Sequence, residues 1–127
     1  MRFLLAAMLA AHGVAHIPGF VVSWRIGVLP ELPYTTTILA ERFDVGDAGI
    51  RVVGLLWLLA GLGFLNAAVL VTMRVPSAYR VTLFMTVASF ALCAVGWPDS
   101  RIGLWVNVVL AALLASNARW AIVASAS

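Results

Sequence analysis

The chain contains no lysine and few charged residues of any kind, and these absences exclude several classes of protein. Charged residues make up 10% of its 127 residues and hydrophobic residues 64%, whereas soluble domains have about 25% charged and about 45–50% apolar residues. A soluble fold cannot hide that much apolar surface, so the composition predicts an integral membrane protein. The net charge of +3 comes from arginines that never form a basic run. They favour anchoring at the membrane interface and argue against nucleic acid as a partner.

Cysteine pairs and the common catalytic motifs are also missing. The single cysteine, Cys93, has no partner in the chain, which excludes a disulfide framework, and we expect it to be a buried thiol. There is no Walker loop, Rossmann glycine motif, CxxC pair or serine triad. No acidic side chain lies inside an apolar stretch, which weakens any interpretation as an ion-driven transporter, since such proteins usually carry a carboxylate at mid-depth.

Four apolar stretches dominate what is present. Each has roughly 20 residues, which is enough for a helix to cross a hydrocarbon core about 30 Å thick. Their expected bounds are residues 3–24, 50–73, 81–97 and 102–122. Tight turns join the last three, so those spans must pack as antiparallel neighbours. The predicted fold is an all-α, antiparallel four-helix transmembrane bundle that forms a single domain, residues 1–127.

The charges suggest an orientation for this bundle. An even number of spans places both termini on one side of the membrane. The terminal side has four arginines and no acid, a net +4, while the other side has four arginines and all five acids, a net −1. The arginines alone divide equally, so the acids decide, and we expect the termini in the cytoplasm.

The loop of residues 25–49, between the first two spans, is far longer than the other connections. Pro30 and Pro33 predict an extended first half. Residues 35–43 are expected to form one or two helical turns, and Asp47 is expected to cap the second span. A loop of this length is either a lid over a site or a plain cover over the bundle, and the sequence leaves both open.

Two histidines, His12 and His16, are the only ionisable side chains deep inside a span. An ionisable pair in a lipid-facing helix is costly, so this pair is the best pointer to function. Its spacing of four residues puts both imidazoles on one helix face. Pro18 has no N–H to donate to the carbonyl of Val14, and we expect it to bend the helix beside His16.

The positions of residues along the four spans indicate which side chains lie at the same depth as the histidine pair. At about 1.5 Å of rise per residue, Trp57 in the second span and Asn107 in the fourth lie at the level of His16, in the half of the bundle near the long loop. Facing inward, they would line a pocket with His12 at its floor. Asp99 and Arg101 lie in the turn before the fourth span. Either Asp99 caps that span and Arg101 pairs with an acid of the long loop, or both residues close the mouth of the pocket.

Metal or haem binding is one role open to the histidine pair. Two imidazoles at i and i+4 can hold one transition-metal ion. Further ligands would have to come from Cys93 or from the acids of the loop, Glu41, Asp44 or Asp47, and none of these lies at a diagnostic spacing. One helix face cannot supply ligands to both sides of a haem, although one histidine could serve as a single axial ligand.

Proton chemistry and simple packing are the other roles. His16 and His12 could act as catalytic residues, since a neutral imidazole can pass a proton to or from a bound substrate. They could equally just hydrogen-bond neighbouring helices, for example at Asn107 or Ser89. The sequence leaves these interpretations open, as it does whether the protein is an enzyme.

Three motifs add a family resemblance. They are HGVAHIPGF at residues 12–20, DVGDAGIRVVGLLWL at residues 44–58, and GWPDSRIG at residues 96–103 followed by Asn107. Together they make the chain resemble, over nearly its whole length, a group of small bacterial four-span membrane proteins of unassigned function. The size and layout are more remotely similar to DoxX-type membrane proteins, a likeness of architecture. The resemblance implies no reaction, but it implies that six residues belong to one recurring pattern: His12, His16, Trp57, Asp99, Arg101 and Asn107.

The sequence therefore favours a membrane protein that binds a small apolar ligand or a cofactor in the loop-side half of the bundle, near His12 and His16. The alternative is a structural or accessory subunit that packs in a homo-oligomer or a larger membrane complex, because the spans carry small-residue faces. A small permease component is the third possibility. The candidate ligand-binding residues beside the histidines are Trp57, Asn107, Asp99 and Arg101.

Overall fold

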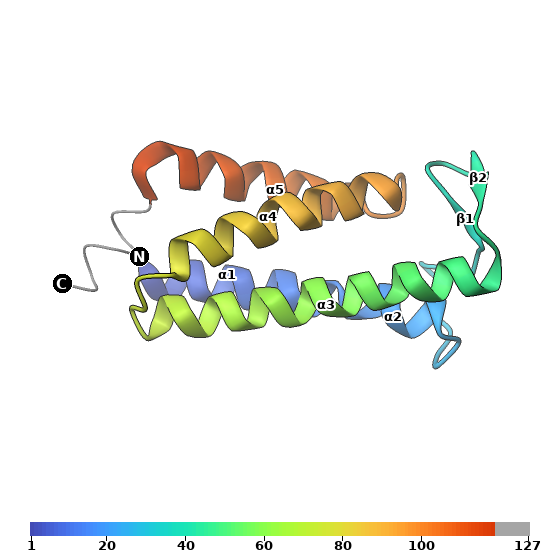
Figure 1. Cartoon of the computed structure of the whole chain (residues 1–127), viewed down its shortest axis with the longest axis horizontal. Helices are drawn as coiled ribbons and strands as arrows, with labels where there is room; N and C mark the ends of the chain where they lie inside the picture. Colours follow the sequence, from blue (N-terminus) through green and yellow to red (C-terminus); the bar gives the residue numbers. More distant parts are fainter. Residues whose placement is uncertain (119–127) are drawn as a thin grey trace.

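The computed structural model describes residues 1–118 and arranges them as antiparallel helices with a short β-ribbon at one end. Figure 1 shows the N-terminus and the end of the last helix at one end of the bundle and the ribbon at the other. Residues 119–122 of the expected fourth span lie outside the described residues. The elements are α1 (Arg2–Ala15), α2 (Ile17–Ser23), β1 (Thr37–Ile38), β2 (Phe43–Asp44), α3 (Gly46–Thr72), α4 (Ala78–Val95), α5 (Arg101–Leu113) and a π-helical turn, η1 (Leu114–Ala118).

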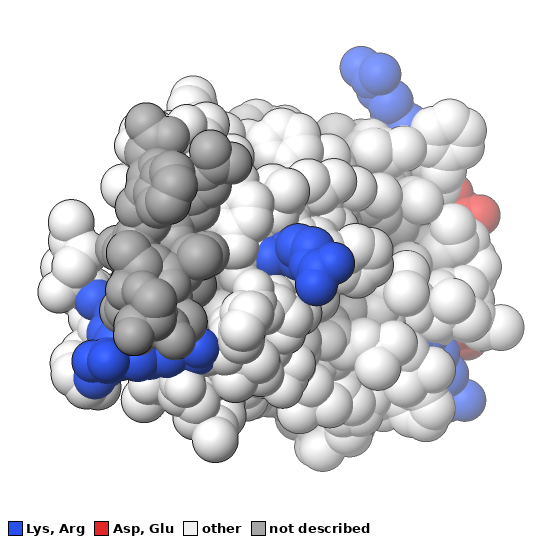
Figure 2. Space-filling view, turned by 60° about the vertical axis from the view of Figure 1, so that its left-hand side comes forward, with Lys and Arg blue, Asp and Glu red and all other residues white. Residues whose placement is uncertain are grey.

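Three helical segments are long and apolar enough to cross a membrane. They are Arg2–Ser23, which joins α1 and α2, then Gly46–Thr72 and Ala78–Val95, while the last apolar helix is shorter, Arg101–Ser116. Figure 2 shows a face with few charged atoms, on which acidic atoms appear only toward the right-hand edge. The prediction of a helical fold is confirmed, and three long apolar helices are compatible with a membrane protein.

The first apolar stretch breaks where its proline predicts. α1 ends at Ala15, α2 begins at Ile17, and Pro18 stands in the first turn of α2. Between the two helices the N–H of His16 donates to the carbonyl of Gly13, 3.1 Å away, a tighter bond than the regular α-helical pattern. The predicted bend beside His16 is therefore confirmed.

Close helix packing holds α1 against α3. The two backbones meet at Gly13 and Gly61, where a Cβ on either glycine would lie only 2.8 Å from the carbonyl oxygen of the other. Side chains of full size cannot approach so closely, so glycine at both positions sets the distance between the helices. Beside this crossing, Leu9, Phe64 and Leu110 are fully buried and join α1, α3 and α5 in one apolar core.

α4 turns a face of small and polar side chains toward the bundle. Thr82, Thr86, Ser89 and Cys93 are all buried, at the spacings of four, three and four that place residues on one side of a helix. The hydroxyls of Thr82 and Thr86 donate to carbonyls of their own helix at 2.8 Å. Ser89 instead forms hydrogen bonds with side chains outside its own helix.

The long loop differs from the prediction at two points. The helical turns expected over residues 35–43 are wrong, because β1 and β2 pair there as an antiparallel ribbon. The three residues at its tip, Leu39, Ala40 and Glu41, adopt positive φ angles of 52°, 55° and 65°, and the N–H groups of Leu39 and Ala40 donate to the carbonyls of Val95 and Trp97 at 2.9 and 3.0 Å. Bonds to a distant helix end thus replace the local helix.

Asp47 does not cap α3 as predicted. The N-cap position is Val45, without a side-chain hydrogen bond, and Asp47 lies in the first turn. Its carboxylate accepts hydrogen bonds from Arg25, at 2.9 Å, and from the Tyr34 hydroxyl. These bonds fasten the first half of the loop to the start of α3. Nearby, the N–H of Gly46 donates to the exposed Asp44 carboxylate and lowers the pKa of that carboxyl.

Candidate functional site

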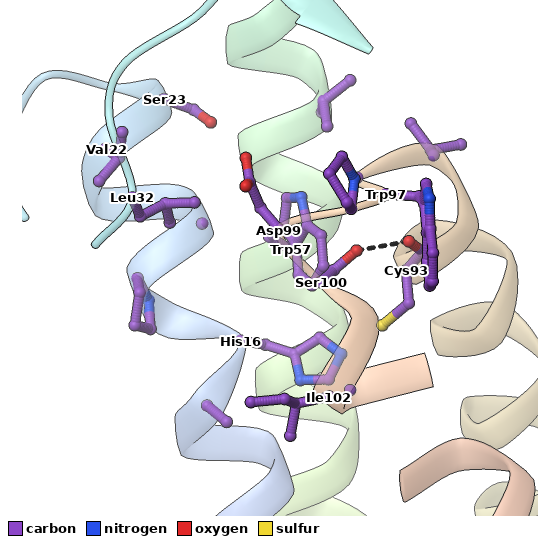
Figure 3. A pocket seen from close by; sticks show the side chains of 18 of the residues that line it. His16, Val22, Ser23, Leu32, Trp57, Cys93, Trp97, Asp99, Ser100 and Ile102 are labelled. Carbon is purple, nitrogen blue, oxygen red and sulfur yellow. Dashed lines mark hydrogen bonds between the residues drawn. The ribbon is translucent and has the colours of Figure 1, made fainter. Parts of the chain in front are cut away.

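A cavity of about 760 Å³ lies beneath the ribbon, between α1 and α2 on one side and the start of α5 on the other. His12 and His16 line it, as do Trp57 of α3 and residues 95–100 between α4 and α5. Residues 32–41 of the loop line the end near the ribbon, with gaps in that run. Figure 3 shows His16, Trp57 and Asp99 on different walls of the same space. Its volume is typical of pockets for small molecules.

Trp57 forms one wall of the cavity because glycines make room for its ring. A Cβ on Gly19 of α2 would lie 2.7 Å from the indole, and one on Gly96 would lie 3.0 Å from it. The first distance is too short for a real side-chain contact and the second is unusually tight, so the indole packs closely against glycine backbone on both sides. The Trp57 ring centre is 5.2 Å from that of His16, and the predicted meeting of these two residues is present.

A chain of hydrogen bonds joins the two histidines to α4 and α5. His16 Nδ1 is 2.7 Å from the His12 carbonyl, and His16 Nε2 is 2.7 Å from Ser89 Oγ. Asn107 Nδ2 donates to Ser89 Oγ at 2.8 Å, and Asn107 Oδ1 is 3.2 Å from His12 Nε2. At most 5% of each of these four residues is exposed. The network therefore links α1, α4 and α5 inside the bundle, next to the cavity.

The network has a single direction when all its members are uncharged. A carbonyl only accepts, so His16 must carry its proton on Nδ1, and its Nε2 accepts from the Ser89 hydroxyl. Ser89 then accepts from the Asn107 amide, whose oxygen is left to accept a proton from His12 Nε2. The bonds thus assign opposite tautomers: Nδ1–H for His16 and Nε2–H for His12.

The two histidines are consequently unequal. Both ring nitrogens of His16 are engaged, while His12 Nδ1 has no hydrogen-bond partner among the described residues. Over residues 1–118, the fully buried side-chain nitrogen and oxygen atoms without a hydrogen-bond partner are Nε and Nη1 of Arg2. His12 Nδ1 is not one of them, so this nitrogen is partly accessible. His12, which lines the cavity, thus has the free lone pair, a difference from His16 that their shared helix face and spacing did not predict.

The other sequence-predicted residues divide between the cavity and its surroundings. Asp99 lines the cavity near the loop and is exposed. Asn107 is fully buried and contacts His12, but it does not line the cavity. Arg101 is exposed and also lies outside the lining. It forms no ion pair with a loop acid, since the single ion pair over residues 1–118 joins Arg25 and Asp47.

The donor set does not fit a metal site. Over residues 1–118 the structure holds no group of three His, Cys, Asp or Glu side chains close enough to bind one ion. His16 also has no free ring nitrogen, because Nδ1 bonds the His12 carbonyl and Nε2 bonds Ser89. A transition metal held by both histidines would have to break one of these bonds and would still lack a third protein ligand.

Sequence reasoning missed the two glycines that seat Trp57. It considered Ser89 only as one of two possible partners for a histidine, although Ser89 stands at the centre of the network. The signal was available in α4, where the polar residues recur at helical spacing and mark the inward face. The long loop was expected to be a lid or a cover, but no local signal singled out Leu32 and Ile38, which line the cavity.

Comparison with protein-family models, with curated proteins and with solved structures finds no match for this chain. The resemblance to small four-span membrane proteins therefore stays a prediction.

Proposed function

We propose that this protein is a four-span protein of the bacterial cytoplasmic membrane that binds a small, predominantly apolar molecule in the cavity beside His12 and His16. The observation that carries the proposal is the cavity itself. A space of about 760 Å³ is walled by apolar side chains and an indole, with a few polar groups gathered at its ends, a combination typical of small-molecule sites.

The ligand reaches the cavity from the bilayer side. Ala11 and Ala15 of α1 and Ile102 of α5 line the cavity and are also exposed on the outer surface. The wall between α1 and α5 thus reaches the outer surface of the bundle, and we propose that the ligand enters there, where lipid tails would surround a membrane-inserted chain. An apolar molecule dissolved in the bilayer can enter there without crossing water.

His12 is the residue that meets the ligand. Its free Nδ1 can accept a hydrogen bond, and it can act as a general base if the ligand has an acidic proton. His16 acts through position: its bonds to the His12 carbonyl and to Ser89 fix the helix break and its own ring. If the protein is an enzyme, His12 rather than His16 carries the proton transfer.

Photolabelling tests this function. The protein is reconstituted in lipid nanodiscs with an alkane that carries a diazirine, and labelled peptides are mapped by mass spectrometry. We expect labelling of the cavity residues that saturates and is displaced by excess unlabelled alkane. Labelling spread evenly over all lipid-facing residues, without saturation, would refute the proposal.

A matched pair of variants separates the cavity from the lipid surface. Ala15→Phe fills the cavity from its exposed side and should abolish the saturable labelling. Val14→Phe places the same ring on the neighbouring residue, which is 54% exposed and does not line the cavity, and should leave the labelling unchanged. Equal effects of the two variants would contradict the proposed site.

A further inference from the structure

The polar groups of the cavity restrict the chemistry of the head group that it can accept. This inference rests on the proposed ligand-binding function and concerns the class of ligand. Two features support it: the sign of the charges in the cavity lining, and the direction of the hydrogen bonds that hold His12.

The charged side chains of the lining are all acidic. Glu41 of the ribbon tip and Asp99 of the α4–α5 turn both line the cavity and are exposed at its loop end. No arginine lines it, and the chain has no lysine. Neither carboxylate forms an ion pair within residues 1–118, where the one ion pair is that of Arg25 with Asp47. The charged side chains at the mouth are therefore both negative, and neither is neutralised by an ion pair.

The free ring nitrogen of His12 in the lining is an acceptor. Asn107 and Ser89 fix His12 in the Nε2–H form, so that its Nδ1 presents a lone pair and no proton. His12 is only 5% exposed, and an acceptor buried this far is costly when a ligand leaves it without a donor. The indole N–H of Trp57 is a donor on the wall, but it is a single neutral group and cannot compensate an anion.

We propose that the cavity selects amphiphiles whose head group donates hydrogen bonds and carries no negative charge, such as long-chain amines and alcohols, and rejects long-chain carboxylates. A cationic or neutral donor is favoured by the mouth carboxylates through charge and by His12 through its lone pair. A carboxylate is repelled by the mouth and has no proton to offer to His12.

Competition against the diazirine alkane tests the selection in the same nanodiscs, made of zwitterionic lipid. The competitors share one chain and differ in head group: dodecylamine, dodecanol, dodecyl methyl ether and dodecanoate, at about pH 8.5, where the amine and the carboxylate are both charged. We expect the amine to compete at least about tenfold better than the carboxylate, and the alcohol to compete better than the ether, which only accepts. Competition by dodecanoate equal to that of dodecylamine would overturn the inference.

Charge-neutral variants locate the cause. The double variant Glu41→Gln and Asp99→Asn should reduce the ratio between amine and carboxylate severalfold, whereas Glu31→Gln, an exposed loop acid outside the lining, should leave it unchanged. An unchanged ratio in the double variant would also overturn the inference. Failure of the proposed function looks different, because the alkane label itself would then not saturate.

Discussion

Replacing Ser89 by alanine removes the centre of the hydrogen-bond network while hardly changing the volume of the side chain. Ser89 donates to His16 Nε2 at 2.7 Å and accepts from Asn107 Nδ2 at 2.8 Å. Ser89→Ala leaves one buried acceptor and one buried donor without these partners, at positions that are at most 2% exposed. The stability of the folded protein should fall as a result.

The magnitude follows from the two bonds lost. An unsatisfied buried polar group costs about 1–3 kcal/mol in soluble proteins, but hydrogen bonds between membrane helices average only about 0.6 kcal/mol, with a maximum near 1.7. Two bonds therefore predict a loss of about 1–3 kcal/mol in the free energy of unfolding.

Thr86→Val is the matched control for this prediction. Thr86 lies on the same buried face of α4, but its hydroxyl donates to the carbonyl of Thr82 in its own helix. Its loss leaves no side chain of another helix unpaired, so the variant should lose less than about 1 kcal/mol. Both variants are compared by reversible unfolding in mixed micelles, followed by circular dichroism. Equal losses for Ser89→Ala and Thr86→Val would refute the network as a source of stability.

A double-mutant cycle checks that the bonds act as one unit. Asn107→Leu should cost less in the Ser89→Ala background than in the wild type, with a coupling of about 0.5–3 kcal/mol, because the two residues share a bond. Additive losses would mean that the two side chains act separately.

Three further predictions concern the packing and the loop. Gly61→Ala should lower the unfolding free energy by about 1–3 kcal/mol, because its Cβ would lie 2.8 Å from the Gly13 carbonyl oxygen, and an unchanged value in the same micelle assay would contradict the close approach. Asp47→Asn removes an exposed ion pair with Arg25 and should cost at most about 1 kcal/mol, a loss that shrinks with added salt. Because the pKa of Asp44 is lowered by the N–H two residues later, its bond to that N–H is complete above the ordinary carboxyl range and is lost as the pH falls through the lowered pKa. Amide exchange by NMR, corrected for the intrinsic rate, should show protection of that N–H at neutral pH and loss of it only in acid.

The helices and the break in the first of them could be predicted because both have local causes. Long apolar runs specify helices, and the missing N–H of Pro18 specifies the bend. A comparison of depth along the helices predicted that His16 and Trp57 lie at one level, and their ring centres are 5.2 Å apart. Depth alone could not tell which side of its helix Asn107 takes, so its place behind the histidines, outside the cavity, needed the three-dimensional structure.

The ribbon could not be predicted from its own residues. Its tip is held by bonds from Leu39 and Ala40 to Val95 and Trp97, more than fifty positions further along the chain. Local propensity favoured a helical turn over residues 35–43, and contacts with a distant helix end outweighed it. The cover of the cavity, and with it Glu41 at the mouth, depends on this long-range contact.

The network of His16, Ser89 and Asn107 also has a consequence for how the chain is made. His16 is synthesised long before its partner, because Ser89 follows 73 residues later. At about 5–20 residues per second, synthesis of that interval takes about 4–15 s. During this time the imidazoles of α1 and of the turn after it lack their final partners, because the hydrogen bonds to Ser89 and Asn107 can form only once α4 and α5 exist. The polar network is therefore among the last parts of the fold that can assemble, although two of its four side chains lie in the first sixteen residues.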